Sequence, residues 1–304
     1  MLRIMRQLRR RLQRLSPQMG GSVLLGVAAL VGIGGLGWVA RDVTAGQDAD
    51  QRPSLLQLLD QVNPSARPFV LDPVRRPAPA PPSHVAWSSP LRRQCVVEDP
   101  RTRQSLRRLL AELDTSKRRL HIDPTNYGER FSRDAFNNPV DPTPRMVVLH
   151  ETVYGIESAV QTFLTPHPRD DDQVSYHMLV GLNGQVVEVL DPSRRAFGAG
   201  NSAFNGQWVV TNPKVGGSVN NFALHLSLET PIDGENNGAG HSGYTPAQYD
   251  AVAVVLADWM RRFGIPATNI TTHRYVDLGG ERSDPRSFDW RELQQRLAAL
   301  GLLC

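Results

Sequence analysis

Two short apolar runs, residues 175–180 and 185–190, lie on either side of the dipeptide Asn183-Gly184. This dipeptide favours a tight hairpin because both of its residues tolerate positive φ. In residues 222–229, Leu224, Leu226 and Leu228 alternate with His225, Ser227 and Glu229. Strict alternation is typical of a strand with one face on a core and the other face on a groove. The region therefore predicts a β-sheet that contains one antiparallel pair.

Helical signals surround these strands. Thr245 is followed by Pro-Ala-Gln, a capping sequence, and then by an apolar stripe that ends at Gly264; this pattern predicts a helix. Residues 102–113 carry leucines at helical spacing and predict a shorter helix. From Thr143 onward the order is strand, helix, hairpin, strand, helix. We therefore expect an α/β fold with a mixed central β-sheet flanked by helices.

The N-terminal end has a different composition. Residues 1–19 contain six arginines and no acidic residue, and residues 20–40 contain no charged residue. Twenty-odd helical residues at about 1.5 Å each span roughly 30 Å, the thickness of a bilayer core. We expect a basic cytoplasmic tail and a transmembrane helix, with the remaining chain exported. A cleaved signal peptide is the alternative.

The charge balance argues against nucleic acid as a partner. The formal net charge is +4, but without the six tail arginines 28 basic residues face 30 acidic ones. A nucleic-acid-binding groove requires Lys and Arg to gather on the folded part, and the sequence shows no such gathering.

The middle of the chain predicts a spacer and then a folded region. Residues 41–94 contain nine prolines and are expected to form a semi-rigid linker. Residues 95–142 are assigned to an N-terminal extension, and residues 143–304 to the main domain. The only two cysteines, Cys95 and Cys304, lie near the ends of the folded part. They form either one disulfide or two separate thiols.

Three residues have the chemistry of metal ligands. His150 ends the apolar run that starts at Met146, while His273 and Asp284 flank a loop that contains two glycines. Two imidazoles and a carboxylate suit zinc, and three protein ligands leave a position open for water, as in catalytic zinc sites. Each residue alone also has an ordinary interpretation, as a core histidine or as a turn residue.

Several motifs share their order with a known family. They are Val147-Val-Leu-His150, Ser175-Tyr-His-Met-Leu-Val180, Asn220-Asn-Phe222, Tyr244-Thr-Pro-Ala-Gln248 and the segment from His273 to Trp290. Over about residues 143–300 the chain resembles the type 2 N-acetylmuramoyl-L-alanine amidases, a zinc superfamily that also includes the peptidoglycan recognition proteins.

The resemblance implies roles for individual residues. It implies that His150, His273 and Asp284 bind one zinc ion. Tyr176 is expected beside the open coordination position, and Arg282 stands where the family usually has lysine. Ser227 stands where one branch of the family has a glutamate. Glu229, two residues further along the same strand, is therefore a candidate general base.

The implied function is hydrolysis of the amide bond between N-acetylmuramic acid and L-alanine, with peptidoglycan or a muropeptide as substrate. An inner-membrane anchor would place the domain in the periplasm or cell envelope, whereas cleavage of the N-terminal segment as a signal peptide would make the protein a secreted one. The alternative is a non-catalytic peptidoglycan-recognition module. Zinc content and release of stem peptides distinguish the two.

Overall fold

The computed structural model of the protein describes residues 74–95 and 99–304. The predicted tail and transmembrane segment lie outside these residues, as does most of the predicted linker, and the bounds of the five predicted regions stay predictions. No helix within the described residues is long and apolar enough to cross a membrane.

A six-stranded sheet organises the fold, in the order β1-β5-β4-β9-β3-β10. The inner strands β4, β9 and β3 and the edge strand β10 run parallel to one another, whereas β5 is antiparallel to β4. This confirms the mixed α/β sheet. The strands are β1 (Arg118–Arg119), β3 (Met146–Glu151), β4 (Met178–Val180), β5 (Val186–Glu188), β9 (Ala223–Leu228) and β10 (Ile270–Thr272).

Every residue of β3 and β9 is buried. The alternation in residues 222–229 predicted a strand with one face on a groove, but both faces of β9 are covered. On the polar face of β9, the His225 ring contacts the His150 ring and lies close to Gly198. Burial of both faces is possible for a central parallel strand.

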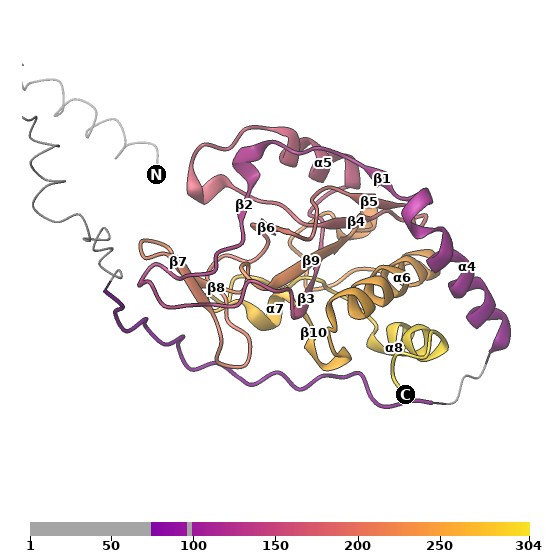
Figure 1. Ribbon diagram of the computed structural model, residues 1–304. Helices are drawn as coiled ribbons and strands as arrows, with labels where there is room; N and C mark the ends of the chain where they lie inside the picture. Colours follow the sequence, from indigo (N-terminus) through magenta and orange to yellow (C-terminus); the bar gives the residue numbers. More distant parts are fainter. Residues whose placement is uncertain (1–73, 96–98) are drawn as a thin grey trace, which may run out of the picture. The chain divides into compact units, whose positions relative to one another are not determined.

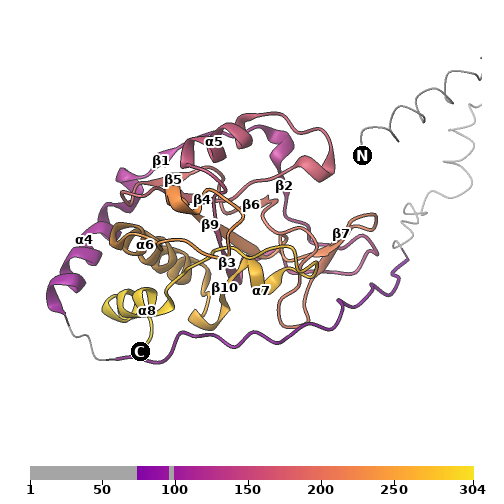
Figure 2. The ribbon, with the colours of Figure 1, turned by 180° about the vertical axis from the view of Figure 1, so that it is seen from behind.

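Helices α4 (Pro100–Ser116), α6 (Pro246–Phe263) and α8 (Trp290–Ala299) contact one another and lie on one side of the sheet (Figures 1 and 2). Their apolar residues join the leucines of β9 in the largest core cluster. α6 begins as predicted, because Thr245 and Gln248 form a capping box. It ends at Phe263, and the C-cap is the predicted Gly264, whose φ of 67° suits glycine.

The other face of the sheet carries smaller elements. α5 (Ile156–Leu164) contributes Phe163 to a second cluster with β4 and β5. The remaining elements are the short helix α7 (His273–Val276), the paired strands β2 (Tyr127–Glu129) and β6 (Arg194–Ala196), the paired strands β7 (Val209–Asn212) and β8 (Gly216–Ser218), and the 3-10 turns η2 (Pro124–Asn126), η3 (Asp170–Asp172), η4 (Ile232–Gly234) and η5 (Ala267–Asn269).

The predicted hairpin forms between β4 and β5, with Gly184 at a φ of 81°. The first strand is shorter than predicted. The amide of Ser175 donates to the carbonyl of Phe197, which lies outside the predicted pair. His177 still bonds to the sheet, because its amide donates to His225 of β9 and its carbonyl accepts from Val189. Tyr176 therefore lies in an irregular segment just before β4.

Cys95 and Cys304 form a disulfide, with their Cα atoms 4.6 Å apart. The described residues before Cys95 run along the folded region (Figure 1). Trp87 packs against Tyr275 and Trp290, with ring centroids 4.5 and 5.7 Å away. Leu91 is buried in the largest core cluster. Residues 74–95 are thus held by side-chain packing as well as by the disulfide.

Candidate active site and metal centre

His150, His273 and Asp284 converge at one edge of the sheet. His150 lies near the end of β3, and His273 directly follows β10, which runs parallel to β3 with Thr272 opposite Leu149. Parallel strands bring their carboxyl ends to the same edge, so the two imidazoles meet. One ligand atom from each of the three residues lies within 4.8 Å of the others.

The charge states of this cluster suit a divalent metal. Oδ2 of Asp284 lies 3.2 Å from Nδ1 of His150 and 3.1 Å from Nδ1 of His273. Burial lowers the pKa of His150 to about 4, so its imidazole is neutral at neutral pH. Burial acts to raise the pKa of Asp284, but the hydrogen bonds from the two histidines outweigh it and hold that pKa well below its usual range.

Two nitrogen donors and one ionised carboxylate fit zinc, and the cluster faces a cleft of about 1070 Å³ that leaves room for a fourth ligand. Several loops line the cleft. They are η3, the hairpin 211–218 and parts of the segments 195–201, 236–238 and 281–286. Tyr176, Glu151 and His273 also line it.

Tyr176 lines this cleft and stacks on His150, with ring centroids 4.4 Å apart and an interplanar angle of 24°. Burial raises the pKa of Tyr176, so its hydroxyl is protonated at neutral pH and can donate a hydrogen bond. Arg282 also lines the cleft and is exposed. Its guanidinium has no hydrogen-bond or ion-pair partner within residues 74–95 and 99–304. The structure thus brings both residues to the cleft of the cluster.

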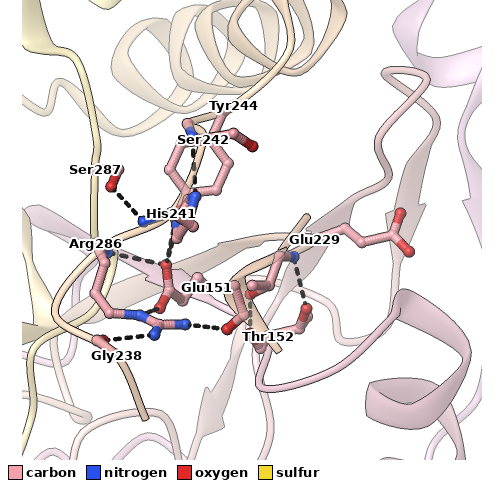
Figure 3. Close-up of polar contacts among 12 residues, drawn as sticks. Glu151, Thr152, Glu229, Gly238, His241, Ser242, Tyr244, Arg286 and Ser287 are labelled. Atoms are coloured by element: carbon pink, nitrogen blue, oxygen red, sulfur yellow. Dashed lines mark hydrogen bonds and ion pairs between the residues drawn. The ribbon is translucent and has the colours of Figure 1, made fainter. Parts of the chain in front are cut away.

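Glu229 is not brought to this cleft. Its carboxylate accepts hydrogen bonds from the backbone amides of Ile156, at 3.0 Å, and Leu182, at 2.8 Å. Glu229 therefore stabilises the first turn of α5, and its side chain points away from Glu151 (Figure 3). This placement does not support the prediction that Glu229 is the general base, because Glu229 is not among the residues that line the cleft.

A buried network beside the cluster was not assigned from the sequence. Glu151 accepts hydrogen bonds from the Tyr244 hydroxyl, at 2.5 Å, from His241 Nε2, at 3.1 Å, and from the backbone amide of Arg286, at 2.9 Å. The Arg286 guanidinium pairs with the same carboxylate and donates to three backbone carbonyls between residues 234 and 238 (Figure 3). We call these four residues the Glu151 network.

The Glu151 network fixes both segments that supply the cluster, because Glu151 follows His150 and Arg286 lies two residues after Asp284. The sequence does contain a signal for it. An acidic residue, Glu151, and a basic residue, Arg286, each lie within two positions of a predicted metal ligand. Nothing in the local sequence shows that these two residues pair with each other.

The N-acetylmuramoyl-L-alanine amidase family model matches residues 139–287. A relative from Citrobacter freundii, the 1,6-anhydro-N-acetylmuramyl-L-alanine amidase AmpD, is 31% identical over 120 residues, which are 39% of this chain and 54% of that protein. The chain thus spans about half the length of this curated relative.

Two solved structures are also similar. A selenomethionine derivative of AmpD has a TM-score of 0.45 at 24% identity and covers 60% of this chain and 94% of its own. The second is the amidase AmiD from E. coli, in complex with anhydro-N-acetylmuramic acid-L-Ala-D-gamma-Glu-L-Lys. It has a TM-score of 0.39 at 22% identity, and the match covers 56% of this chain and 65% of the AmiD chain. The family match spans the three clustered side chains, and through residues 139–287 this chain belongs to the type 2 N-acetylmuramoyl-L-alanine amidase family.

Proposed function

We propose that this protein is a zinc-dependent amidase that hydrolyses the bond between N-acetylmuramic acid and L-alanine in peptidoglycan or in muropeptides released from it. The observation that carries the proposal is the convergence of His150, His273 and Asp284 on one point of a large cleft, inside the region that matches the family. The similar protein from Citrobacter freundii is named as a 1,6-anhydro-N-acetylmuramyl-L-alanine amidase.

His150, His273 and Asp284 would hold one zinc ion. Zinc bound there would lower the pKa of a bound water to about 7 and polarise the scissile carbonyl. The protonated Tyr176 hydroxyl supplies a hydrogen bond to the carbonyl oxygen as negative charge develops on it. The exposed guanidinium of Arg282 supplies a permanent positive charge on the same cleft, which orients an anionic or carbonyl group of the substrate.

The Glu151 network holds the site in place rather than moving protons. Its carboxylate already accepts bonds from Arg286, Tyr244 and His241, so its charge is compensated by donors of the protein itself. Its contribution is to keep the segments of His150 and Asp284 at a fixed separation, as a metal site with an open position requires.

We also propose that the amidase domain faces the periplasm, on an inner-membrane anchor formed by residues 20–40 or released by cleavage of that segment. The arginine-rich tail and the uncharged run support this placement. The Cys95–Cys304 disulfide supports an oxidising compartment. In intact spheroplasts, added protease should degrade the domain; protection of the domain until the cells are lysed would refute the placement.

The catalytic proposal is tested with purified protein, by measuring bound zinc and the release of stem peptides from muropeptides. Wild type is expected to contain about one zinc ion per chain and to release peptide. His273→Ala should lose both. His121→Ala is the matched control, because His121 is exposed and lies outside the cluster. Binding of peptidoglycan without any hydrolysis by the wild type would favour the recognition-module alternative.

A further inference from the structure

The second ring nitrogen of His150 contacts another histidine. Nε2 of His150 lies 2.9 Å from Nδ1 of His225, and the two ring planes are tilted by 40°. His225 is fully buried on β9, the strand that pairs with β3. His150 is therefore held between two partners, with Asp284 at Nδ1 and His225 at Nε2.

A glycine provides the space for this contact. A Cβ atom at Gly198 would lie 2.4 Å from Nδ1 of His225 and 2.5 Å from its Cγ. These distances are far shorter than any real contact, so a side chain at position 198 would force the His225 ring to move. The φ of Gly198 is not positive. Glycine is needed here for close approach, and not for an unusual backbone conformation.

The direction of the hydrogen bond follows from the metal site. If Nδ1 of His150 is a ligand, its lone pair is committed and the ring proton is on Nε2. His150 then donates to Nδ1 of His225, and His225 carries its own proton on Nε2. That Nε2 atom is buried and has no hydrogen-bond partner within the described part of the chain. A buried donor without a partner destabilises the fold. The presence of a histidine at position 225 is therefore not explained by a gain in stability from its own hydrogen bonds.

We propose that His225 is a positioning residue that holds His150 in the ring orientation and tautomer that present Nδ1 to zinc, and that Gly198 provides the space for it. This inference rests on the proposed zinc amidase function. Metal-bound histidines generally donate their second nitrogen to a fixed acceptor, and loss of that acceptor typically weakens metal affinity by about 10- to 100-fold.

The test is the zinc affinity of the purified full-length protein, measured by competition with a chromophoric chelator. His225→Leu removes the acceptor and should weaken zinc binding by about 10- to 100-fold. His225→Asn keeps an oxygen acceptor near the position of Nδ1 and should recover most of the affinity. Ser227→Ala is the matched control, since Ser227 lies two residues further on β9 with a buried hydroxyl that has no partner in the described residues. It should retain wild-type affinity.

Gly198→Ala gives an independent test. In the wild-type background it should weaken zinc binding as His225→Leu does, because the new Cβ displaces the ring. In a His225→Ala background the space is vacant, so Gly198→Ala should have almost no further effect. Such non-additivity identifies two residues that act through one contact.

The outcomes separate the two proposals. If wild type binds zinc and releases peptide but His225→Leu keeps the same zinc affinity, the role of His225 is refuted while the amidase function stands. If wild type binds no zinc, both proposals fail. If His225→Leu does not fold, nitrogen-15 NMR of the zinc-loaded wild type decides. A coupling across the hydrogen bond between His150 Nε2 and His225 Nδ1 supports the inference, and its absence overturns it.

Discussion

Replacement of Arg286 by methionine should destabilise the protein by about 3 kcal/mol, because it leaves the Glu151 carboxylate buried without its cation. The side chains of Arg286 and Glu151 are only 8% and 5% exposed. Removal of one partner from a buried ion pair typically costs about 3–5 kcal/mol. The lower end applies here, because Tyr244, His241 and the backbone amide at position 286 still donate to the carboxylate.

The carbonyl partners of Arg286 add less to this cost. Two of the three belong to Asn236 and Gly238, which are exposed, so water can replace the guanidinium there. Only the carbonyl of Gly234 belongs to a buried residue. Loss of this one buried contact costs about 1–3 kcal/mol, so it is the only carbonyl partner that adds appreciably to the cost of the broken ion pair.

Urea denaturation followed by circular dichroism, with a chelator present so that metal binding does not contribute, measures the change in the free energy of unfolding. Arg282→Met is the matched control on the same loop. Its side chain is exposed and without a partner in the described residues, so the change should stay within about 0.5 kcal/mol. Glu151→Leu combined with Arg286→Met should cost less than Arg286→Met alone, because no charge stays buried. An Arg286→Met protein as stable as the Arg282→Met control would refute the assigned role of the network.

Three further predictions concern pH, the disulfide and the N-terminal contacts. Burial and the neighbouring Arg130 lower the pKa of His177 to about 3. The unfolded chain therefore takes up a proton at His177 near pH 6.5 that the folded chain refuses, and stability falls as the pH decreases below that value by up to about 1.4 kcal/mol per unit. In urea denaturation between about pH 5 and pH 7, His177→Gln should show a shallower slope than wild type, and an unchanged slope would contradict the assignment. Replacing Cys95 and Cys304 together by serine should lower the free energy of unfolding by about 2–4 kcal/mol. The double variant should melt at a lower temperature than the oxidised wild type, and reducing agent should not change that temperature further. A melting temperature equal to that of the oxidised wild type would count against this. Trp87→Ala removes the ring contacts and the hydrogen bond to Thr268. Limited proteolysis should therefore cut residues 74–91 faster than in wild type, while the rest of the domain resists. Equal cutting rates would show that the Trp87 ring does not hold this segment.

Local patterns in the sequence determined several elements correctly. The capping box at Thr245 and the glycine at 264 predicted both ends of α6, because capping depends on residues within one helical turn. The dipeptide at 183–184 predicted the hairpin of β4 and β5. His150, His273 and Asp284 were selected by their side-chain chemistry and motif context, and the structure brings them together.

Only the tertiary structure decided which distant side chains meet. Glu151 and Arg286 are 135 positions apart, and His150 and His225 are 75 apart. Their contacts depend on the parallel register of β3 and β9 and on the path of the loop after Asp284, neither of which follows from periodicity. The sequence suggested Glu229 as a base because it shares a strand face with Ser227, yet the backbone amides of α5 and the β4–β5 turn occupy its carboxylate. Local propensity specifies helices and strands, whereas a catalytic geometry depends on long-range packing that brings separate segments within hydrogen-bonding distance.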